Sequence, residues 1–123
     1  MISLPSVLVV DDDPDSRDAL SDLLELKGVE VLAKGVNGHD AVQKFSQHKP
    51  DLILMDMMMP NFDGMYGLEH IKNIDSSAKV IMITADQSQT TRDKIYRYPN
   101  TKIIAKPIDI DQLVKLIMEK SFW

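Results

Sequence analysis

The sequence predicts an α/β fold built on a parallel β-sheet. Short apolar runs alternate five times with stretches of helical periodicity, which is typical of consecutive βαβ units. Three of the runs are apolar almost throughout, as expected of strands that helices cover on both faces of the sheet. The strands are expected at Val7–Val10, Val29–Ala33, Leu52–Met55, Val80–Ile83 and Lys102–Ala105.

The first helix is marked by its capping residues. Asp13 can act as the N-cap, and Pro14 is favoured at the first helical position. Gly28 can end the helix because glycine readily adopts the left-handed conformation. The apolar stripe expected to face the sheet consists of Ala19, Leu20, Leu23 and Leu24.

The later helices are predicted in the same way. One follows Asn37, one follows Asp63, and the last begins after Asp109. The stretch 86–97 is polar until its end, so a helix there has only a narrow apolar face and is expected to be mobile. The side chains expected to face the sheet are Ala41, Val42, Phe45, Leu68, Ile71, Leu113, Val114 and Ile117.

Length and composition exclude several classes of protein. The 123 residues are expected to form a single domain, 1–123, with no linker and no output domain. The net charge is −5 and no basic run is dense, which argues against direct nucleic-acid binding. The absence of cysteine excludes disulfides and fits a reducing compartment. Neither a signal peptide nor an apolar span for membrane insertion is recognisable, so we expect a soluble, cytoplasmic protein.

Three of the predicted strands end in charged residues that could share one site. Asp11 and Asp12 follow the first strand, Asp56 follows the third, and Lys106 follows the fifth. In an open parallel sheet, the residues just past the carboxyl ends of the strands line one crevice. Clustered carboxylates repel one another unless a cation lies between them, and Mg²⁺ is bound by carboxylates, waters and phosphate oxygens. The sequence therefore predicts a cation-dependent anion site suited to phosphoryl transfer.

Two other acidic motifs would give different kinds of site. Asp11, Asp13 and Asp15 match the first ligands of an EF-hand loop, but Ser16 replaces the turn glycine and Asp22 replaces the bidentate glutamate, so we exclude it. The Asp-x-Asp at Asp11 also resembles haloacid-dehalogenase-like phosphatases. Asp15 stands where that family usually has Thr or Val, and the late acidic pair after its lysine is absent. A Mg²⁺-dependent phosphatase with Asp11 as nucleophile remains a minor alternative.

The downstream motifs add a family resemblance. Asp56 opens the pattern D-x-x-M-P-x-x-D-G over residues 56–64, followed by Ile81–Ala85 and then Lys106-Pro107. In this order, from Val7 to about Met118, the chain resembles the receiver domain of two-component response regulators. The resemblance implies a three-layer flavodoxin-like fold with sheet order 2-1-3-4-5. It also implies a phosphorylatable signalling switch, which catalyses only its own phosphorylation and dephosphorylation and is otherwise no enzyme.

The resemblance further implies a metal site and its ligands. Asp12 and Asp56 look like carboxylate ligands of Mg²⁺, together with the backbone carbonyl of Met58. Asp11 is expected to hold metal-bound water and orient the cluster. Mn²⁺ is a possible substitute for Mg²⁺.

The phosphoryl site is likewise implied by position. Asp56 looks like the phosphoacceptor, supplied by a histidine kinase, a phosphotransfer protein or a small phosphodonor. Lys106 is expected to pair with one phosphoryl oxygen, and the Thr84 hydroxyl to donate to another. We expect a cis peptide bond before Pro107 that directs Lys106 inward, because cis bonds occur almost only before proline.

Several positions depart from the usual receiver pattern. Ile103 stands where receivers often carry Tyr or Phe, and an aliphatic side chain can neither rotate a ring nor present a hydroxyl as an aromatic switch residue does. Ala85, directly after Thr84, is also expected to be a switch or tuning position. Met58 and Asp86 are expected to flank the site and to slow hydrolysis of the phosphoryl group, because Met58 offers water no hydrogen bond and Asp86 adds negative charge.

The sequence leaves three candidate functions for this chain. The first is a phosphorylatable switch whose downstream protein partner is unknown, the second is the phosphatase using Asp11, and the third is a constitutive interaction module of receiver shape. The complete set of acids and Lys106 argues against the third.

Overall fold

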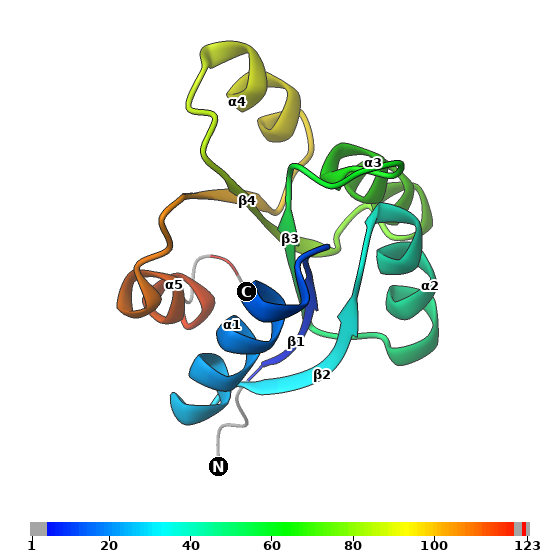
Figure 1. Cartoon of the computed structure of the whole chain (residues 1–123). Coiled ribbons are helices and arrows are strands. Elements are labelled where there is room, and N and C mark those ends of the chain that lie inside the picture. Colours follow the sequence, from blue (N-terminus) through cyan, green and yellow to red (C-terminus); the bar gives the residue numbers. More distant parts are fainter. Residues whose placement is uncertain (1–4, 120–121, 123) are drawn as a thin grey trace.

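A computed structural model describes residues 5–119 and 122 of the chain. In this part of the chain, five strands alternate with five helices (Figure 1). All strand pairs are parallel and the sheet order is β2-β1-β3-β4-β5, as the resemblance implies. The elements are β1 (Ser6–Val10), α1 (Pro14–Leu26), β2 (Glu30–Gly35), α2 (Gly38–His48), β3 (Leu52–Asp56), α3 (Gly64–Ile74), β4 (Lys79–Thr84), α4 (Gln89–Tyr96), β5 (Thr101–Ala105) and α5 (Ile110–Ile117).

Helices cover both faces of the sheet, which gives three layers (Figure 1). Alternate side chains of β1 point to opposite faces, so Val7 and Val9 lie in one core cluster while Leu8 and Val10 lie in the other. The first cluster contains residues of α1 and α5, and the second contains residues of α2, α3 and α4. The nearly continuous apolar composition of the central strands is thus explained by burial on both faces.

Strand β2 differs from the expected range. It runs over Glu30–Gly35 and not over Val29–Ala33, because the amide of Val29 donates to the carbonyl of Leu24 in the turn that ends α1. The strand lies at the edge of the sheet and is only half covered. Its apolar pattern therefore gives a weaker signal than that of the central strands.

The helix caps are as predicted, with Asp13, Asn37, Asp63 and Asp109 at the N-cap positions. The predicted stripe of α1 is wrong in part. Leu20, Ser21 and Leu24 are buried, whereas Ala19 is exposed and Leu23 is 43% exposed. Ser21 can replace an apolar residue because its hydroxyl donates to the carbonyl of Arg17, so no polar group is left without a partner.

Helix α4 has the narrow buried face that its polar sequence predicts. Ser88 is its N-cap, and its buried residues are Thr91 and Ile95. As for membranes, none of the helices in the described ranges is both long enough and apolar enough to cross a bilayer.

Lys72 is a buried residue that the sequence pattern does not predict. It lies on α3, is only 6% exposed, and its Nζ donates to the carbonyls of Ala78, Pro99 and Asn100. These carbonyls directly precede β4 and β5, so the lysine joins α3 to the amino ends of both strands. Burial lowers the pKa of Lys72 to about 8.

Candidate functional site

The carboxyl ends of β1 and β3 bring three carboxylates together. Asp11 and Asp12 follow β1, and Asp56 ends its neighbour β3. One carboxylate oxygen from each residue lies within 4.8 Å of the others. Asp56 is 4% exposed, whereas Asp12 is exposed to solvent. Burial raises the pKa of Asp11, and the charges of Asp56 and Asp12 raise it further. This predicted cluster is therefore present, and its members repel one another.

Lys106 reaches the same cluster from the end of β5. Its Nζ lies 2.8 Å from Oδ2 of Asp56, while the amide of Met58 donates to Oδ1 at 3.3 Å. The Lys106–Pro107 peptide bond is cis, as predicted. Both oxygens of the Asp56 carboxylate thus have a donor from the protein, and the ammonium group partly offsets the charge of the three acids.

Thr84 ends β4, the strand between β3 and β5, and its side chain is buried. Its carbonyl accepts a hydrogen bond from the amide of Lys106 at 3.0 Å. Its hydroxyl oxygen accepts one from the amide of Asp86 at 2.9 Å. Thr84 therefore stands at the same edge of the sheet as Asp56 and Lys106, as predicted.

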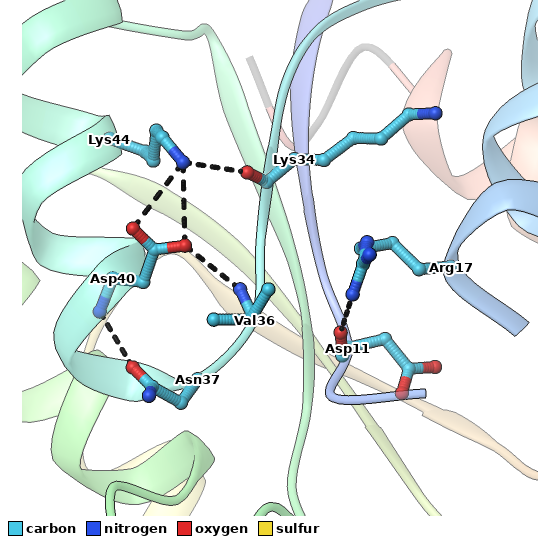
Figure 2. A network of polar contacts seen from close by, with 7 residues as sticks. All are labelled: Asp11, Arg17, Lys34, Val36, Asn37, Asp40 and Lys44. Carbon is cyan, nitrogen blue, oxygen red and sulfur yellow. Dashed lines mark hydrogen bonds and ion pairs between the residues drawn. The ribbon is translucent and has the colours of Figure 1, made fainter. Parts of the chain in front are cut away.

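The loop that carries Asp11 is fixed from two sides. The Asp11 amide donates to the carbonyl of Gly35 at 3.1 Å. The guanidinium of Arg17 donates to the carbonyl of Asp11 at 2.9 Å, as Figure 2 shows. The sequence gives no signal for Arg17, because a contact from a side chain to a backbone carbonyl leaves no residue pattern. Arg17 is thus a residue near the site that the sequence does not predict.

A second polar network holds the turn after β2, next to the Asp11 loop (Figure 2). The Asp40 carboxylate accepts from the amide of Val36 at 3.0 Å and from Lys44 at 3.3 Å. Lys44 also donates to the carbonyl of Lys34 at 3.1 Å. The Asn37 side chain accepts from the amide of Asp40 at 2.8 Å, which caps α2. This network keeps in place the segment to which the Asp11 amide is bonded.

The predicted switch and tuning positions lie on β5 and in the loops after β3 and β4. Ile103 is half-buried and packs against the core cluster on the α2, α3 and α4 face. Met58 is 75% exposed, and Ala85 is exposed. At these three positions, the described structure places no group that hydrogen-bonds the Asp56 carboxylate except the backbone amide of Met58.

The Asp86 carboxylate is held by α4. One oxygen accepts from the amide of Ser88 at 2.8 Å, and the other accepts from the hydroxyl of Thr91 at 2.6 Å. The hydrogen bond from the Thr91 hydroxyl, followed by that from Ser88, lowers the pKa of Asp86. The sequence predicts that this charge acts near the site, and it does not predict the bond to Thr91. The spacing of Asp86 and Ser88 before α4 and of Thr91 in its first turn is a capping signal that could have suggested this bond.

Residues 7–118 match the response regulator receiver domain family. The chain belongs to this family. It is 37% identical over 111 residues to the chemotaxis protein CheY of Bacillus subtilis, covering 90% of this chain and 92% of that protein. It is 32% identical over 115 residues to CheY of Thermotoga maritima, covering 94% and 96% of the two chains.

Solved structures of receivers have the same fold. A CheY-like receiver domain protein from Methanospirillum hungatei superposes with a TM-score of 0.85 at 28% identity, covering 96% of this chain and 94% of that one. The CheX-CheY-BeF3-Mg+2 complex from Borrelia burgdorferi gives 0.83 at 28% identity, covering 92% and 86%. The chain is thus a CheY-like receiver domain, a phosphorylatable switch of the two-component type, and the phosphatase and constitutive-module alternatives are not favoured.

Proposed function

We propose that this receiver accepts a phosphoryl group on Asp56 and so changes a surface that a downstream protein recognises. The observation that carries the proposal is the buried Asp56 carboxylate, paired with Lys106 at 2.8 Å and adjoined by Asp11 and Asp12. A histidine kinase or a phosphotransfer protein would supply the phosphoryl group. The solved complex of a CheY with CheX supports binding to a second protein.

The acidic cluster fits a divalent cation. Asp11, Asp12 and Asp56 offer carboxylate oxygens within 4.8 Å of one another, and oxygen is the donor that Mg²⁺ prefers. We assign the backbone carbonyl of Met58 as a further ligand. Mn²⁺ would replace Mg²⁺ because it accepts the same donors. When bound, the cation would neutralise the charge between these carboxylates and the incoming phosphoryl group.

Asp56, Lys106 and Thr84 have separate roles in the transfer. A carboxylate oxygen of Asp56 attacks the phosphorus atom of a phosphohistidine. An O–P bond forms as the N–P bond breaks, and the released imidazole nitrogen takes a proton from solvent. The Lys106 ammonium attracts one phosphoryl oxygen and the Thr84 hydroxyl donates to another, which compensates the charge of the transferred group. Attack of water on phosphorus later breaks the O–P bond, restoring the carboxylate and releasing inorganic phosphate.

Labelling with a small phosphodonor tests the proposal. The chain is incubated with phosphoramidate and Mg²⁺, and its mass is measured alongside that of the Asp56→Asn and Asp11→Asn variants. We expect about one phosphoryl group per wild-type chain and none on Asp56→Asn, with no turnover of other phosphate esters. Labelling that persists in Asp56→Asn would contradict the proposal. Repeated hydrolysis of a phosphate ester that Asp11→Asn abolishes and Asp56→Asn does not would also contradict it.

A further inference from the structure

A chain of hydrogen bonds leads from the Thr84 hydroxyl to helix α4. The hydroxyl oxygen accepts from the amide of Asp86 at 2.9 Å. The Asp86 carboxylate in turn accepts from the Thr91 hydroxyl at 2.6 Å and from the Ser88 amide at 2.8 Å. Thr91 lies in the first turn of α4 and is buried, and Ser88 is the N-cap of that helix. Each step is a short, directional bond, so the position of Thr84 and that of the first turn of α4 are linked.

The Asp86 carboxylate makes strong hydrogen bonds within this chain of bonds. The pKa of Asp86 is lowered, chiefly by the bond from Thr91, so the group remains ionised near neutral pH. Hydrogen bonds to an ionised acceptor are shorter and about twice as strong as neutral ones. The bond from Thr91 to the Asp86 carboxylate is therefore a strong contact between the loop after β4 and the helix.

Helix α4 is able to respond to such a link. It has eight residues, and its buried side chains are Thr91 and Ile95. Little apolar area therefore anchors it to the sheet, and weakly packed elements are the ones that move at low cost. Of these two side chains, Thr91 is the one that bonds to the loop beyond Thr84.

Coupling from the site to α4 through apolar packing has little support in this chain. Ile103 is half-buried and packs against the same core cluster as Ile95. An aliphatic side chain forms no directional bond and has no ring whose rotation could report an event at Asp56. The polar route through Thr84 is therefore the better candidate for coupling.

We propose that Asp86 and Thr91 are positioning residues that transmit the phosphorylation state of Asp56 to α4, an inference that rests on the proposed function. When the Thr84 hydroxyl donates its proton to a phosphoryl oxygen, its oxygen moves towards Asp56 and draws the Asp86 amide with it. The Asp86 carboxylate then pulls the Thr91 hydroxyl and the first turn of α4. The two states of the site thereby become two positions of the helix.

Amide NMR spectra test this coupling. Beryllium fluoride with Mg²⁺ is the probe, because it mimics the phosphoryl group without a covalent bond. The variant is Thr91→Val, which keeps the shape of the side chain and removes its hydroxyl. Thr90→Val is the matched control, since Thr90 is the preceding, exposed residue of the same helix. Thr91→Ser restores the hydroxyl and is the rescue.

The readout compares the amides of residues 89–96 with those of Asp56 and Lys106. We expect the probe-induced shifts in residues 89–96 to fall at least twofold in Thr91→Val, while Thr90→Val and Thr91→Ser behave as the wild type. The shifts at Asp56 and Lys106 should persist in all of them. If Thr91→Val does not fold, Asp86→Ala serves in its place with the same expected loss, because it removes the exposed side chain that accepts from Thr91 and Ser88.

Two results would overturn the coupling while leaving the proposed function intact. One is an undiminished α4 response in Thr91→Val with a normal response at Asp56. The other is loss of the α4 response in Ile103→Val but not in Thr91→Val, which would assign the coupling to the apolar core. Failure of Asp56 and Lys106 to respond even in the wild type would overturn the proposed function itself.

Discussion

The Nζ of Lys106 and the carboxylate of Asp56 lie 2.8 Å apart although β4 separates the strands that carry them. Lys106 follows β5 and Asp56 ends β3, so the pair spans the end of the intervening strand. Thr84 ends that strand, and its carbonyl fixes the Lys106 amide at 3.0 Å. The three strand ends thereby place one cation and one hydrogen-bonding hydroxyl beside a buried carboxylate, and the phosphoryl chemistry proposed for this receiver depends on that arrangement.

Replacing the lysine should slow phosphorylation strongly. In Lys106→Met the alkyl stem remains, but the charge that compensates the phosphoryl oxygens is lost. Loss of one such electrostatic contact typically costs about 100-fold in rate. Initial rates of labelling by phosphoramidate measure the effect, with Lys94→Met, an exposed lysine of α4, as the control. A Lys106→Met rate within a factor of about two of the Lys94→Met rate would show that the pair has no part in the transfer.

Met58 should control how long the phosphoryl group persists. The residue is 75% exposed, its amide bonds to Asp56, and its side chain offers no group that orients water. In Met58→Asn, a polar side chain can position the attacking water, so loss of the label should become several-fold faster. The decay of the phosphorylated form after removal of the phosphodonor gives this rate. Decay within seconds in the wild type, unchanged in Met58→Asn, would contradict the role of Met58.

A methyl group at Gly64 should disturb the site through the backbone. A Cβ there would collide with the carbonyl oxygen of Asp56 and lie 2.8 Å from Cα of Met57. Backbone atoms cannot give way as a flexible side chain can, so Gly64→Ala should lower the free energy of unfolding by about 2–3 kcal/mol and slow labelling.

Gly35→Ala is the matched control for that substitution, because its nearest neighbour is a side-chain methyl of Val10 at 3.3 Å. It should cost less than about 1 kcal/mol. Urea denaturation of both variants gives the comparison. Equal losses of stability in the two would show that the contact with the Asp56 backbone is not the cause.

Lys72 should make stability depend on pH in the alkaline range. Its pKa is lowered from 10.5 to about 8 in the folded protein, so between these values the unfolded chain binds more protons than the folded one. The contribution of Lys72 to the free energy of unfolding therefore rises as pH increases from 8 towards 10.5, by up to about 3 kcal/mol.

Denaturation of the wild type and of Lys72→Met across this range isolates the effect from other titrating groups. The free energy of unfolding of the wild type minus that of Lys72→Met should increase with pH. A difference that stays constant or shrinks would mean that the three carbonyls hold Lys72 in its charged form throughout.

The positions of the central elements were predictable because burial on two faces leaves a plain apolar run. The predicted range 52–55 lies within β3. Strand β2 begins one residue later than predicted because Val29 bonds to Leu24 in the turn after α1, and as a half-covered edge strand it has a weaker apolar pattern. Asp11, Asp12, Asp56 and Lys106 could be placed together because residues at the carboxyl ends of parallel strands converge.

Other features could not be predicted because they depend on backbone geometry. Buried lysines are rare, and Lys72 is buried only because three carbonyls from distant segments meet at its amine. Arg17 likewise contacts a carbonyl and leaves no residue pattern. The Asp86 side chain bonds to Thr91, and this direction depends on the path of the backbone into α4.

The central claim is that Asp56 is the residue that carries the phosphoryl group, and chemical mapping tests it most directly. After incubation with phosphoramidate and Mg²⁺, borohydride reduces an acyl phosphate on aspartate to homoserine, and peptide sequencing by mass spectrometry locates the product. We expect homoserine at position 56 and at no other aspartate. Homoserine at Asp11 or Asp12, or none at all in a chain that carries the label, would contradict the account.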